Sequence, residues 1–280
     1  MTVVRRTESH FRGVDGLGLF RRAWLPEEPR HTLVLVHGYA EHSGRYEGFG
    51  SWFAARGFAV HAYDHRGHGR SRGRRCHVGA FREYLDDLDG FLEIVRREDS
   101  QTPITLVGHS MGGLVTLAYL VDRRPAIHSA VTSGAGLALG RGISRLRVGA
   151  ARVLRRLLPR FSLGSGLDPD GLSRDPTVVK GYLEDPLVSR SMTTSLAAEL
   201  LSAVPETAAR AAEVAVPLLM LHGEEDPLCP ADGSRAFSDE VAVAGSDLRL
   251  YPRLRHEIFN EPERERVYQD ILDWLEGLLE

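Results

Sequence analysis

The sequence predicts an α/β fold with a mostly parallel central sheet. Short apolar runs alternate along the chain with longer segments of helical periodicity, which is the pattern of strand–helix–strand units. Several of these runs are apolar at consecutive positions, as strands buried on both faces of a parallel sheet are. The length of 280 residues, with 42% hydrophobic and 26% charged residues, is ordinary for a globular chain with a sizeable core.

The expected strands begin with an antiparallel pair in the first part of the chain, at roughly 7–13 and 18–25. Buried strands follow at 32–36, 58–62, 104–107, 130–132, 217–221 and 248–251. Helical periodicity predicts helices at 46–56, 80–97, 111–123, 232–243 and 262–279. The last of these is expected to begin after Asn260, a good N-cap residue, with Pro262 in its first turn.

The interval from about 136 to 212 breaks this rhythm. It has no convincing buried strand and carries helical patterns near 142–158, 173–184 and 192–203. Compact domains rarely contain structureless loops of such length. We therefore expect residues 136–212 to be a helical cap, or lid, inserted into a core domain of residues 1–135 and 213–280.

The first helical pattern of this cap is both apolar and basic. Seven Arg and no acidic residue fall between 141 and 160, and apolar residues recur at 143, 146, 150, 153, 154 and 157. A basic amphipathic helix of this kind can lie on an anionic membrane surface. It can equally be a lid helix with a solvated arginine face, and the sequence leaves both interpretations open.

Composition excludes several other classes of protein. The chain has 35 Lys and Arg against 38 Asp and Glu, a formal charge of −3, so nothing indicates a nucleic-acid partner. Cys76 and Cys229 cannot build a disulfide scaffold and form no metal motif. The start of the chain lacks a signal-peptide stretch, and no apolar run is long enough to span a membrane. We expect a cytoplasmic protein, peripheral to the membrane if its cap binds there.

Gly-x-Ser-x-Gly, the motif of a nucleophile elbow, occurs twice in the sequence. An elbow needs a buried strand before the serine and a helix after it, because the turn projects the serine from the end of the strand. The strand at 104–107 precedes Ser110, and the apolar run 114–120 follows it. Ser71 instead follows a polar turn and runs into a basic stretch where no helix starts. Ser110 is therefore the candidate nucleophile, and Ser71 is expected in a loop.

A serine hydroxyl needs a base to accept its proton and an acid to orient that base. In α/β proteins with such an elbow, the order along the chain is Ser, then Asp or Glu, then His. Asp226 lies in the loop after a late strand, where Glu224 and Glu225 compete with it. Of the twelve histidines, His256 alone lies beyond this loop. We therefore expect Ser110, Asp226 and His256 to form a catalytic triad.

An oxyanion hole should pair the amide that follows the nucleophile, that of Met111, with an amide from the loop after an early strand. His37, Gly38 and Tyr39 lie in such a loop, and the amide of Tyr39 is the natural second donor because Gly38 permits a close turn. Donors of this kind stabilise charge that develops only in the transition state, by roughly 3 kcal/mol each. The alternative for His37 and Gly38 is a simple turn at the end of the strand.

Together these residues resemble the α/β-hydrolase superfamily and, within it, the monoacylglycerol lipases of the bacterial type. Residues 37–46, HGYAEHSGRY, are similar to the family's oxyanion-loop signature, and 63–71, YDHRGHGRS, resemble its second block. Further similar segments are the elbow at 108–113, cap segments at 172–176 and 182–187, and the acid and histidine segments at 222–226 and 256–262. The resemblance covers about residues 10 to 279.

The resemblance implies an α/β-hydrolase fold and the triad and oxyanion amides named above. It also implies a glycerol-binding end of the pocket at Glu41, Arg45 and Tyr182. Alternatively, Glu41 and Arg45 pair structurally beside the oxyanion loop, and Tyr182 packs within the cap. Some animal relatives carry a second histidine three positions after the catalytic one, where this chain has Phe259. The headgroup geometry is therefore expected to differ from theirs.

The cap residues Leu137, Ile143 and Leu146 are candidates for lining an apolar acyl tunnel. His65 and His68 look like metal ligands, but the family pattern implies a structural loop there. Because no third ligand lies near them in the sequence, we expect no metal.

We therefore expect a serine hydrolase that cleaves monoacylglycerols to glycerol and free fatty acid through an acyl-enzyme, with no cofactor. A lysophospholipase or a general carboxylesterase would carry the same triad. Outside enzymes, the alternative is a hydrolase-like fold that only binds a ligand.

Overall fold

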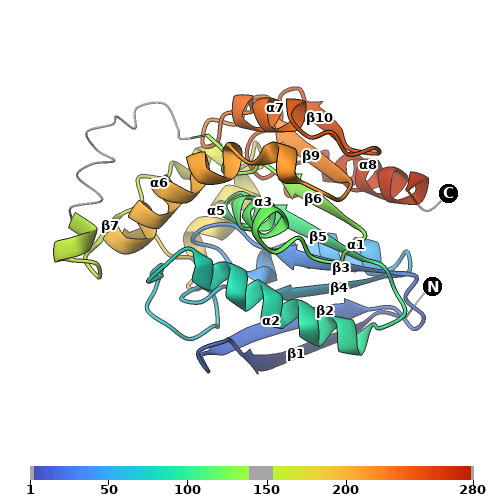
Figure 1. Ribbon diagram of the computed structural model, residues 1–280, viewed down its shortest axis with the longest axis horizontal. Coiled ribbons are helices and arrows are strands. Elements are labelled where there is room, and N and C mark those ends of the chain that lie inside the picture. Colours follow the sequence, from blue (N-terminus) through green and yellow to red (C-terminus); the bar gives the residue numbers. More distant parts are fainter. Residues whose placement is uncertain (1–2, 139–153, 279–280) are drawn as a thin grey trace.

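An eight-stranded sheet forms the centre of the computed structural model, which describes residues 3–138 and 154–278 (Figure 1). In order across the sheet, its strands are β1 (Arg5–Arg12), β2 (Gly18–Leu25), β4 (Phe58–Tyr63), β3 (His31–Val36), β5 (Ile104–His109), β6 (Ser129–Ser133), β9 (Leu218–Gly223) and β10 (Asp247–Tyr251). β2 pairs antiparallel with β1 and β4, and the other neighbouring pairs of this sheet are parallel. The predicted α/β fold with a mostly parallel sheet is thus confirmed.

Helices cover both faces of this sheet, because successive side chains of each strand point to opposite faces. In β3, Val34 and Val36 pack on one face, while Leu33 and Leu35 pack on the other. The first face is covered by α2 (Arg82–Glu98), α3 (Met111–Arg123) and α7 (Asp232–Asp239), and the second by α1 (Glu47–Ala54) and α8 (Arg264–Gly277). In Figure 1, α2 and α3 lie in front of the sheet. The sheet is therefore a buried platform from whose strand ends loops can project.

The start of α8 differs from the prediction. The helix begins at Arg264, and its N-cap residue Glu263 makes no side-chain capping hydrogen bond. Asn260 does not cap the helix, because its side-chain amide donates to Oε2 of Glu257 at 2.9 Å instead. The other predicted strands and helices of the core are present, with ends shifted by a few residues.

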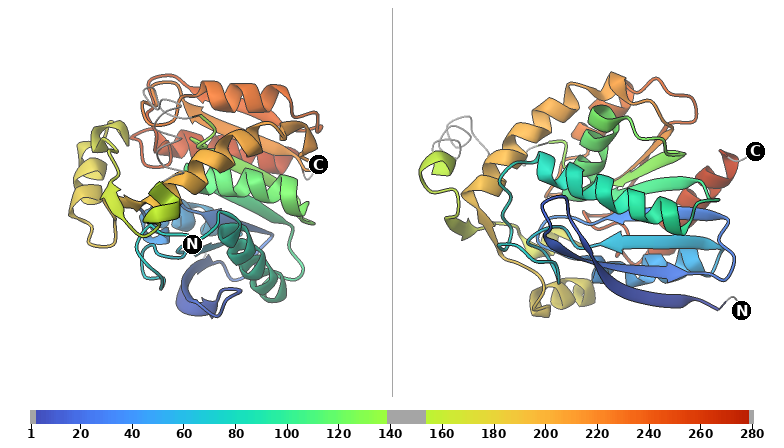
Figure 2. Two further views of the ribbon diagram at one scale, coloured as in Figure 1. Left: turned by 60° about the vertical axis from the view of Figure 1, so that its left-hand side comes forward. Right: turned by 60° about the horizontal axis from the view of Figure 1, so that its bottom comes forward.

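The cap segment, the described residues 154–212, lies between β6 and β9 in the chain. It contains α5 (Pro176–Glu184), α6 (Thr194–Ala208), the 3-10 turns η2 (Pro169–Gly171) and η3 (Ala211–Glu213), and a small sheet of β7 (Ser162–Gly164) and β8 (Ser191–Thr193). β7 and the start of α6 project beyond the main sheet at the left of Figure 1, and Figure 2 shows them from two further sides. We propose that residues 136–212 act as one cap over the carboxyl ends of the strands.

The sequence pattern predicts part of this segment. The helices expected near 173–184 and 192–203 correspond to α5 and α6. It does not predict β7 and β8, since each has only three residues and β7 is exposed. The helix expected near 142–158 falls largely on residues outside the described ranges.

Two glycines of α1 provide a paired test of the packing between α1 and β2. A Cβ on Gly50 would lie 2.3 Å from Cδ2 of Trp24 in β2, well inside contact distance, whereas the exposed Gly48 has only the Tyr268 hydroxyl nearby, at 3.7 Å. We expect Gly50→Ala to lower the free energy of unfolding by about 1–3 kcal/mol, because overpacking strains the core.

Gly48→Ala is the matched control, and it should raise the free energy of unfolding by about 0.5–1 kcal/mol, because alanine loses less backbone entropy than glycine in a helix. Urea unfolding of both variants measures the two effects. Equal stability of Gly50→Ala and the unmodified protein would show that α1 does not pack on Trp24 as described.

Candidate active site

The turn at Ser110 joins the end of β5 to the start of α3 in a strained backbone conformation. Ser110 has φ +54° and ψ −117°, which L-residues rarely adopt. The flanking glycines permit it, since a Cβ on Gly108 would lie 2.4 Å from Oγ1 of Thr116, and one on Gly112 would lie 2.0 Å from the carbonyl oxygen of Val36. The first Gly-x-Ser-x-Gly motif thus has the backbone of a nucleophile elbow.

Ser71, in the second copy of the motif, has a structural environment. Its hydroxyl donates to the carbonyl of Asp64 and accepts from the amide of Phe20 at 2.8 Å, and the residue is buried. These bonds tie the loop after β4 to β2. The serine is therefore a buried bridge between two strands, as the loop interpretation expects.

The structure brings Ser110, His256 and Asp226 into one hydrogen-bonded chain. Nε2 of His256 lies 2.9 Å from Oγ of Ser110, and its Nδ1 lies 2.6 Å from Oδ2 of Asp226. Because a carboxylate only accepts, the proton on Nδ1 belongs to the bond with Asp226, which leaves Nε2 to accept the serine proton. His256 follows β10 and Asp226 follows β9, so each side chain projects from the carboxyl end of a parallel strand.

Asp226 receives four donors and is therefore held as a carboxylate. Its Oδ1 accepts from the amides of Leu228 at 2.8 Å and Cys229 at 2.9 Å, while Oδ2 accepts from His256 and from Nε2 of His222 at 3.1 Å. Burial alone would raise the pKa of Asp226, but the charge of His256 and the hydrogen bonds lower it. Burial opposes the charge on His256 as well, yet Asp226 raises the pKa of His256 above its usual 6.5.

The neighbouring acids do not share this environment. Glu224 and Glu225 are exposed, and Glu224 pairs with Arg235 at 3.0 Å on the surface. Asp226 is only 8% exposed and faces His256. The geometry therefore distinguishes the three acids that the sequence left as competitors.

Two histidines at this site are missed by the motif search. His222 is the next-to-last residue of β9, four positions before Asp226, and its Nδ1 lies 2.8 Å from Oγ of Ser234, which fixes the ring. His109 precedes the nucleophile, and its ring centroid lies 4.8 Å from that of His256. Burial and the charge of His256 lower the pKa of His109 to about 3, so it remains neutral. In the sequence, both histidines lie near the carboxyl end of a strand and within segments that resemble the family, 108–113 and 222–226.

The residues predicted to supply the oxyanion donors, Tyr39 and Met111, line the same cavity as Ser110. Gly38 is packed so closely that a Cβ there would lie 3.2 Å from Cβ of Ser110, and its own amide donates to Oε1 of Glu41 at 2.6 Å. Within the described ranges, the amides of Tyr39 and Met111 have no hydrogen-bond acceptor, and both residues line the cavity beside Ser110. Two unengaged amides next to a serine hydroxyl suit a developing oxyanion.

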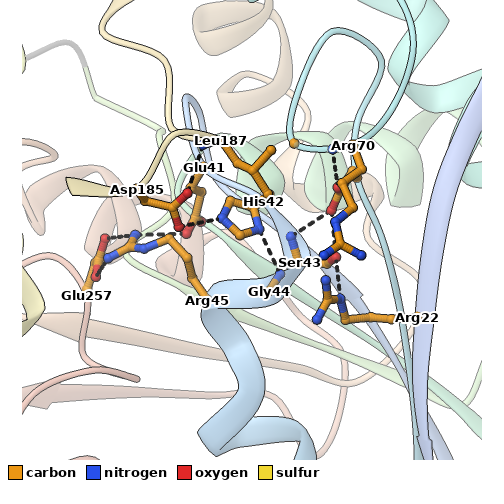
Figure 3. Close-up of polar contacts among 12 residues, drawn as sticks. Arg22, Glu41, His42, Ser43, Gly44, Arg45, Arg70, Asp185, Leu187 and Glu257 are labelled. Carbon is orange, nitrogen blue, oxygen red and sulfur yellow. Dashed lines mark hydrogen bonds and ion pairs between the residues drawn. The ribbon is translucent and has the colours of Figure 1, made fainter. Parts of the chain in front are cut away.

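A buried ionic cluster lies next to this point (Figure 3). Arg45 donates to both carboxylate oxygens of Glu257, at 2.5 and 2.9 Å, and to Oε2 of Glu41 at 3.0 Å. The guanidinium also lies over the ring of Tyr182, 4.9 Å from its centroid. Oε1 of Glu41 further accepts from the hydroxyl of Tyr46 at 2.5 Å. The two interpretations of Glu41 and Arg45 are therefore compatible, since the residues pair with each other and also face the cavity.

The two carboxylates of this cluster differ in how strongly they hold a proton. Burial raises the pKa of Glu41, and Arg45 only partly offsets it. Burial would do the same to Glu257, but the two-point bond to Arg45 lowers the pKa of Glu257 to about 2. Sequence reasoning missed Glu257, whose position directly after His256 is the signal that could have found it.

A cavity of about 390 Å³ opens onto Ser110 and His256. One end carries Glu41, Arg45, Tyr182 and Glu257, and the remaining wall includes the apolar side chains Leu114, Leu167, Leu172, Met192, Leu200, Val204 and Leu228. Of the residues expected to line an acyl tunnel, Leu137 is buried in the hydrophobic core, while its neighbours Gly136 and Ala138 line the cavity. Ile143 and Leu146 lie outside the described residues.

His65 and His68 take part in a buried polar network beneath the oxyanion loop. The amide of His65 donates to Nε2 of His37 at 2.9 Å, and Nε2 of His68 lies 3.6 Å from Sγ of Cys76. In residues 3–138 and 154–278, no three potential metal ligands come close enough together to hold an ion. Within the same ranges, no helix combines the length and the apolar character that crossing a bilayer requires.

Comparison with known proteins finds similar sequences and a similar structure among lipases. Residues 27–263 match the family model described as serine aminopeptidase, S33. A monoacylglycerol lipase of Mycolicibacterium smegmatis is 40% identical over 273 residues, which are 96% of this chain and 97% of that protein. The monoglyceride lipase of Homo sapiens is 32% identical, over 95% of this chain and 89% of that protein. The crystal structure of Paleococcus ferrophilus monoacylglycerol lipase has a TM-score of 0.84 at 32% identity and covers 99% of both chains.

The charge on Asp226 should be measurable at His256. We expect the pKa of the His256 imidazole to lie above 6.5, and Asp226→Asn to lower it, because the variant removes the negative charge that stabilises the imidazolium. A titration of the ring Cε1–H signal by NMR measures both values. A His256 pKa at or below 6.5 in the unmodified protein would contradict the described geometry.

Proposed function

Because the chain belongs to the serine aminopeptidase S33 family and, within the α/β-hydrolases, to the monoacylglycerol lipases, we propose that it hydrolyses monoacylglycerols to glycerol and free fatty acid. One observation carries the proposal. Oγ of Ser110 lies 2.9 Å from Nε2 of His256, with Asp226 behind the ring, in the wall of a cavity that is charged at one end and apolar elsewhere. An ester of a polar alcohol with a long acyl chain likewise has one polar end and one apolar end.

The reaction proceeds in two acyl transfers. Ser110 Oγ attacks the ester carbonyl while His256 takes the hydroxyl proton, and Asp226 orients the ring and stabilises the imidazolium. The amides of Tyr39 and Met111 bind the oxyanion. When the tetrahedral intermediate collapses, His256 gives its proton to the departing glycerol oxygen, which leaves an acyl ester on Ser110. Water then attacks that ester with His256 again as base, which releases the fatty acid and restores the serine.

The two ends of the cavity match the two parts of the substrate. Leu167, Met192, Leu200 and Val204 provide an apolar wall for the acyl chain. The charged end offers carboxylate oxygens, which accept hydrogen bonds from glycerol hydroxyls. With Phe259 buried in the core rather than facing this end, the headgroup contacts fall to Glu41, Arg45, Tyr182 and the adjacent Glu257.

The charge of this end favours a neutral headgroup over a phosphate. Two buried carboxylates, Glu41 and Glu257, share one guanidinium, that of Arg45, so among the residues that the structure describes the cluster has no free cation to bind an anion. The three donors on the oxygens of Glu41 favour its ionised form even though burial raises its pKa. A phosphate placed here would meet like charge in a poorly screened site. This distinguishes the proposal from its first rival, a lysophospholipase.

Ser110→Ala should lower kcat on a 1-monoacylglycerol by about 10⁴-fold or more, because the attacking oxygen is lost. Glycerol release measures the rate, and labelling by a fluorophosphonate probe should disappear in the same variant. Ser71→Ala is the matched control from the second motif, and it should keep the label. Absence of any Ser110-dependent turnover in the unmodified protein would favour the other rival, a hydrolase-like binding module.

The headgroup preference can be measured with lipids of one acyl chain. We expect kcat/KM for 1-monoacylglycerol to exceed that for lysophosphatidic acid and lysophosphatidylcholine by about 100-fold, since an unpaired charge in a buried site costs several kcal/mol. Glu257→Gln should bring the kcat/KM values of the three lipids closer together, because it removes one of the two charges that neutralise Arg45 and lets the guanidinium bind an anion. A short aryl ester controls for the intact triad. Equal rates on all three lipids would refute the headgroup assignment.

We further propose that the cap contacts a membrane surface, where such substrates reside. Close to Arg156 and Arg160 in the chain, the cap segment exposes the apolar side chains Leu157, Leu158, Phe161 and Leu163. Apolar residues next to arginine suit an anionic lipid interface. The protein should co-sediment with vesicles containing phosphatidylserine more than with phosphatidylcholine vesicles, and Leu157→Gln with Phe161→Gln should reduce this without changing rates on a short soluble ester. Equal binding to both vesicle types would contradict the proposal.

A further inference from the structure

The cap segment contacts the oxyanion loop, residues 37–46, at three successive points. The amide of Ser189 donates to the carbonyl of Ala40 at 2.8 Å. Nε2 of His42 lies 2.9 Å from Oδ2 of Asp185 (Figure 3), and the ring of Tyr182 lies under Arg45. All three partners from the cap belong to the end of α5 and the turn that follows it. This turn, residues 185–189, therefore lies directly on the loop that carries the Tyr39 amide.

His42 is fixed at both ring nitrogens. Its Nδ1 accepts from the amide of Gly44 at 3.1 Å, where it caps η1 (Ser43–Tyr46), so the ring proton lies on Nε2 and points to Asp185. The residue is only 6% exposed. The neutral ring satisfies both bonds at once, whereas a proton on Nδ1 would break the cap of η1. His42 thus connects the fold of the oxyanion loop to the cap through one rigid side chain.

Asp185 is fixed in the same way from the cap side. Its Oδ1 accepts from the amide of Leu187 at 2.8 Å, which closes the turn after α5, and its Oδ2 accepts from His42. Although burial opposes it, the bond from His42 keeps the pKa of Asp185 below its usual value. Oδ1 of Asp185 therefore stabilises a turn within the cap, and Oδ2 binds the oxyanion loop through His42.

The loop needs an external restraint at this place. Ala40 has φ +68°, a left-handed conformation that is strained for a residue with a Cβ. It is flanked by Tyr39, which lines the cavity, and by Glu41, whose carboxylate accepts from the amide of Gly38 at 2.6 Å. A change of Ala40 to an ordinary backbone conformation would rotate the peptide group that joins Tyr39 to Ala40. Ser189 acts on the carbonyl of this strained residue, and Asp185 acts on the side chain of His42 two positions later.

We propose that His42 and Asp185 are a positioning pair for the oxyanion hole. By fixing the turn 185–189 to the oxyanion loop, the pair holds Ala40 in its left-handed conformation and keeps the Tyr39 amide directed at the oxyanion. This inference rests on the proposed ester hydrolysis, with Tyr39 as donor. It has a specific consequence: the pair acts on transition-state stabilisation for any ester, including one too short to touch the cap. A pair that merely docks the cap would change only the binding of long acyl chains.

The test measures kcat and KM separately on a short aryl ester and on a long-chain monoacylglycerol. Asp185→Ala and His42→Ala should each lower kcat on the short ester by about ten-fold or more, with KM changed less than about two-fold, because a displaced oxyanion donor is felt only in the transition state. The double variant should be no slower than the slower single variant, since both changes break one contact.

Asp175→Ala is the matched control at the opposite end of α5. Asp175 caps that helix through the amide of Thr177 at 2.8 Å and its side chain makes no hydrogen bond to the oxyanion loop, so the variant should keep kcat on the short ester. If Asp185→Ala does not fold, Asp185→Asn replaces it, because the one amide oxygen can retain the Leu187 turn while the bond to His42 is lost.

Two outcomes overturn the inference. Unchanged kcat on the short ester, with only the KM for the long-chain lipid raised, would mean that the pair docks the cap and nothing more. Additive losses in the double variant would mean that the two residues act independently. Failure of the proposed function is distinguishable from both, since the unmodified protein would then show no turnover that Ser110→Ala abolishes.

Discussion

The close packing of the β5–α3 turn against the end of β3 is the constraint on which the site depends. A side chain larger than hydrogen at Gly112 would collide with the backbone of β3, at 2.0 Å from the carbonyl oxygen of Val36. Because the two backbones touch, the serine that directly follows β5 and the loop that leaves β3 are held side by side. The nucleophile is thus positioned by the rigid sheet, and the proposed restraint from the cap acts only on the loop that carries the Tyr39 amide.

The parallel pairing of the strands also positions the side chains that lie near Ser110. β3, β5, β6, β9 and β10 run in one direction, so their carboxyl ends meet at one edge of the sheet. Ser110, Asp226 and His256 each leave such an end, although up to 146 positions of sequence separate Ser110 from His256. The cap then needs to supply only the walls of the cavity and the restraint on the oxyanion loop.

Sequence reasoning predicts what local pattern encodes and misses what only three-dimensional packing creates. The hydrophobic periodicity predicts the strands and helices of the core, and the order of the motifs along the chain selects the three residues of the candidate triad. His222 and Glu257 lie within the family-like segments 222–226 and 256–262, but the sequence assigns them no role, because their contacts arise only when β9 and the turn after β10 bring them beside Asp226 and Arg45. Likewise, Asn260 reads as a helix cap until Glu257 is seen to take its amide.

The charged groups on either side of His256 explain how one imidazole can serve both as base and as acid. Asp226 stabilises the imidazolium, so the ring can hold the serine proton until the alcohol leaves. Glu257 follows directly in the chain, and its negative charge also raises the pKa of His256. Arg45 keeps Glu257 in its charged form, because its two bonds to Glu257 lower the pKa of that carboxyl to about 2. The guanidinium therefore preserves a charge that favours the imidazolium while it shapes the polar end of the cavity.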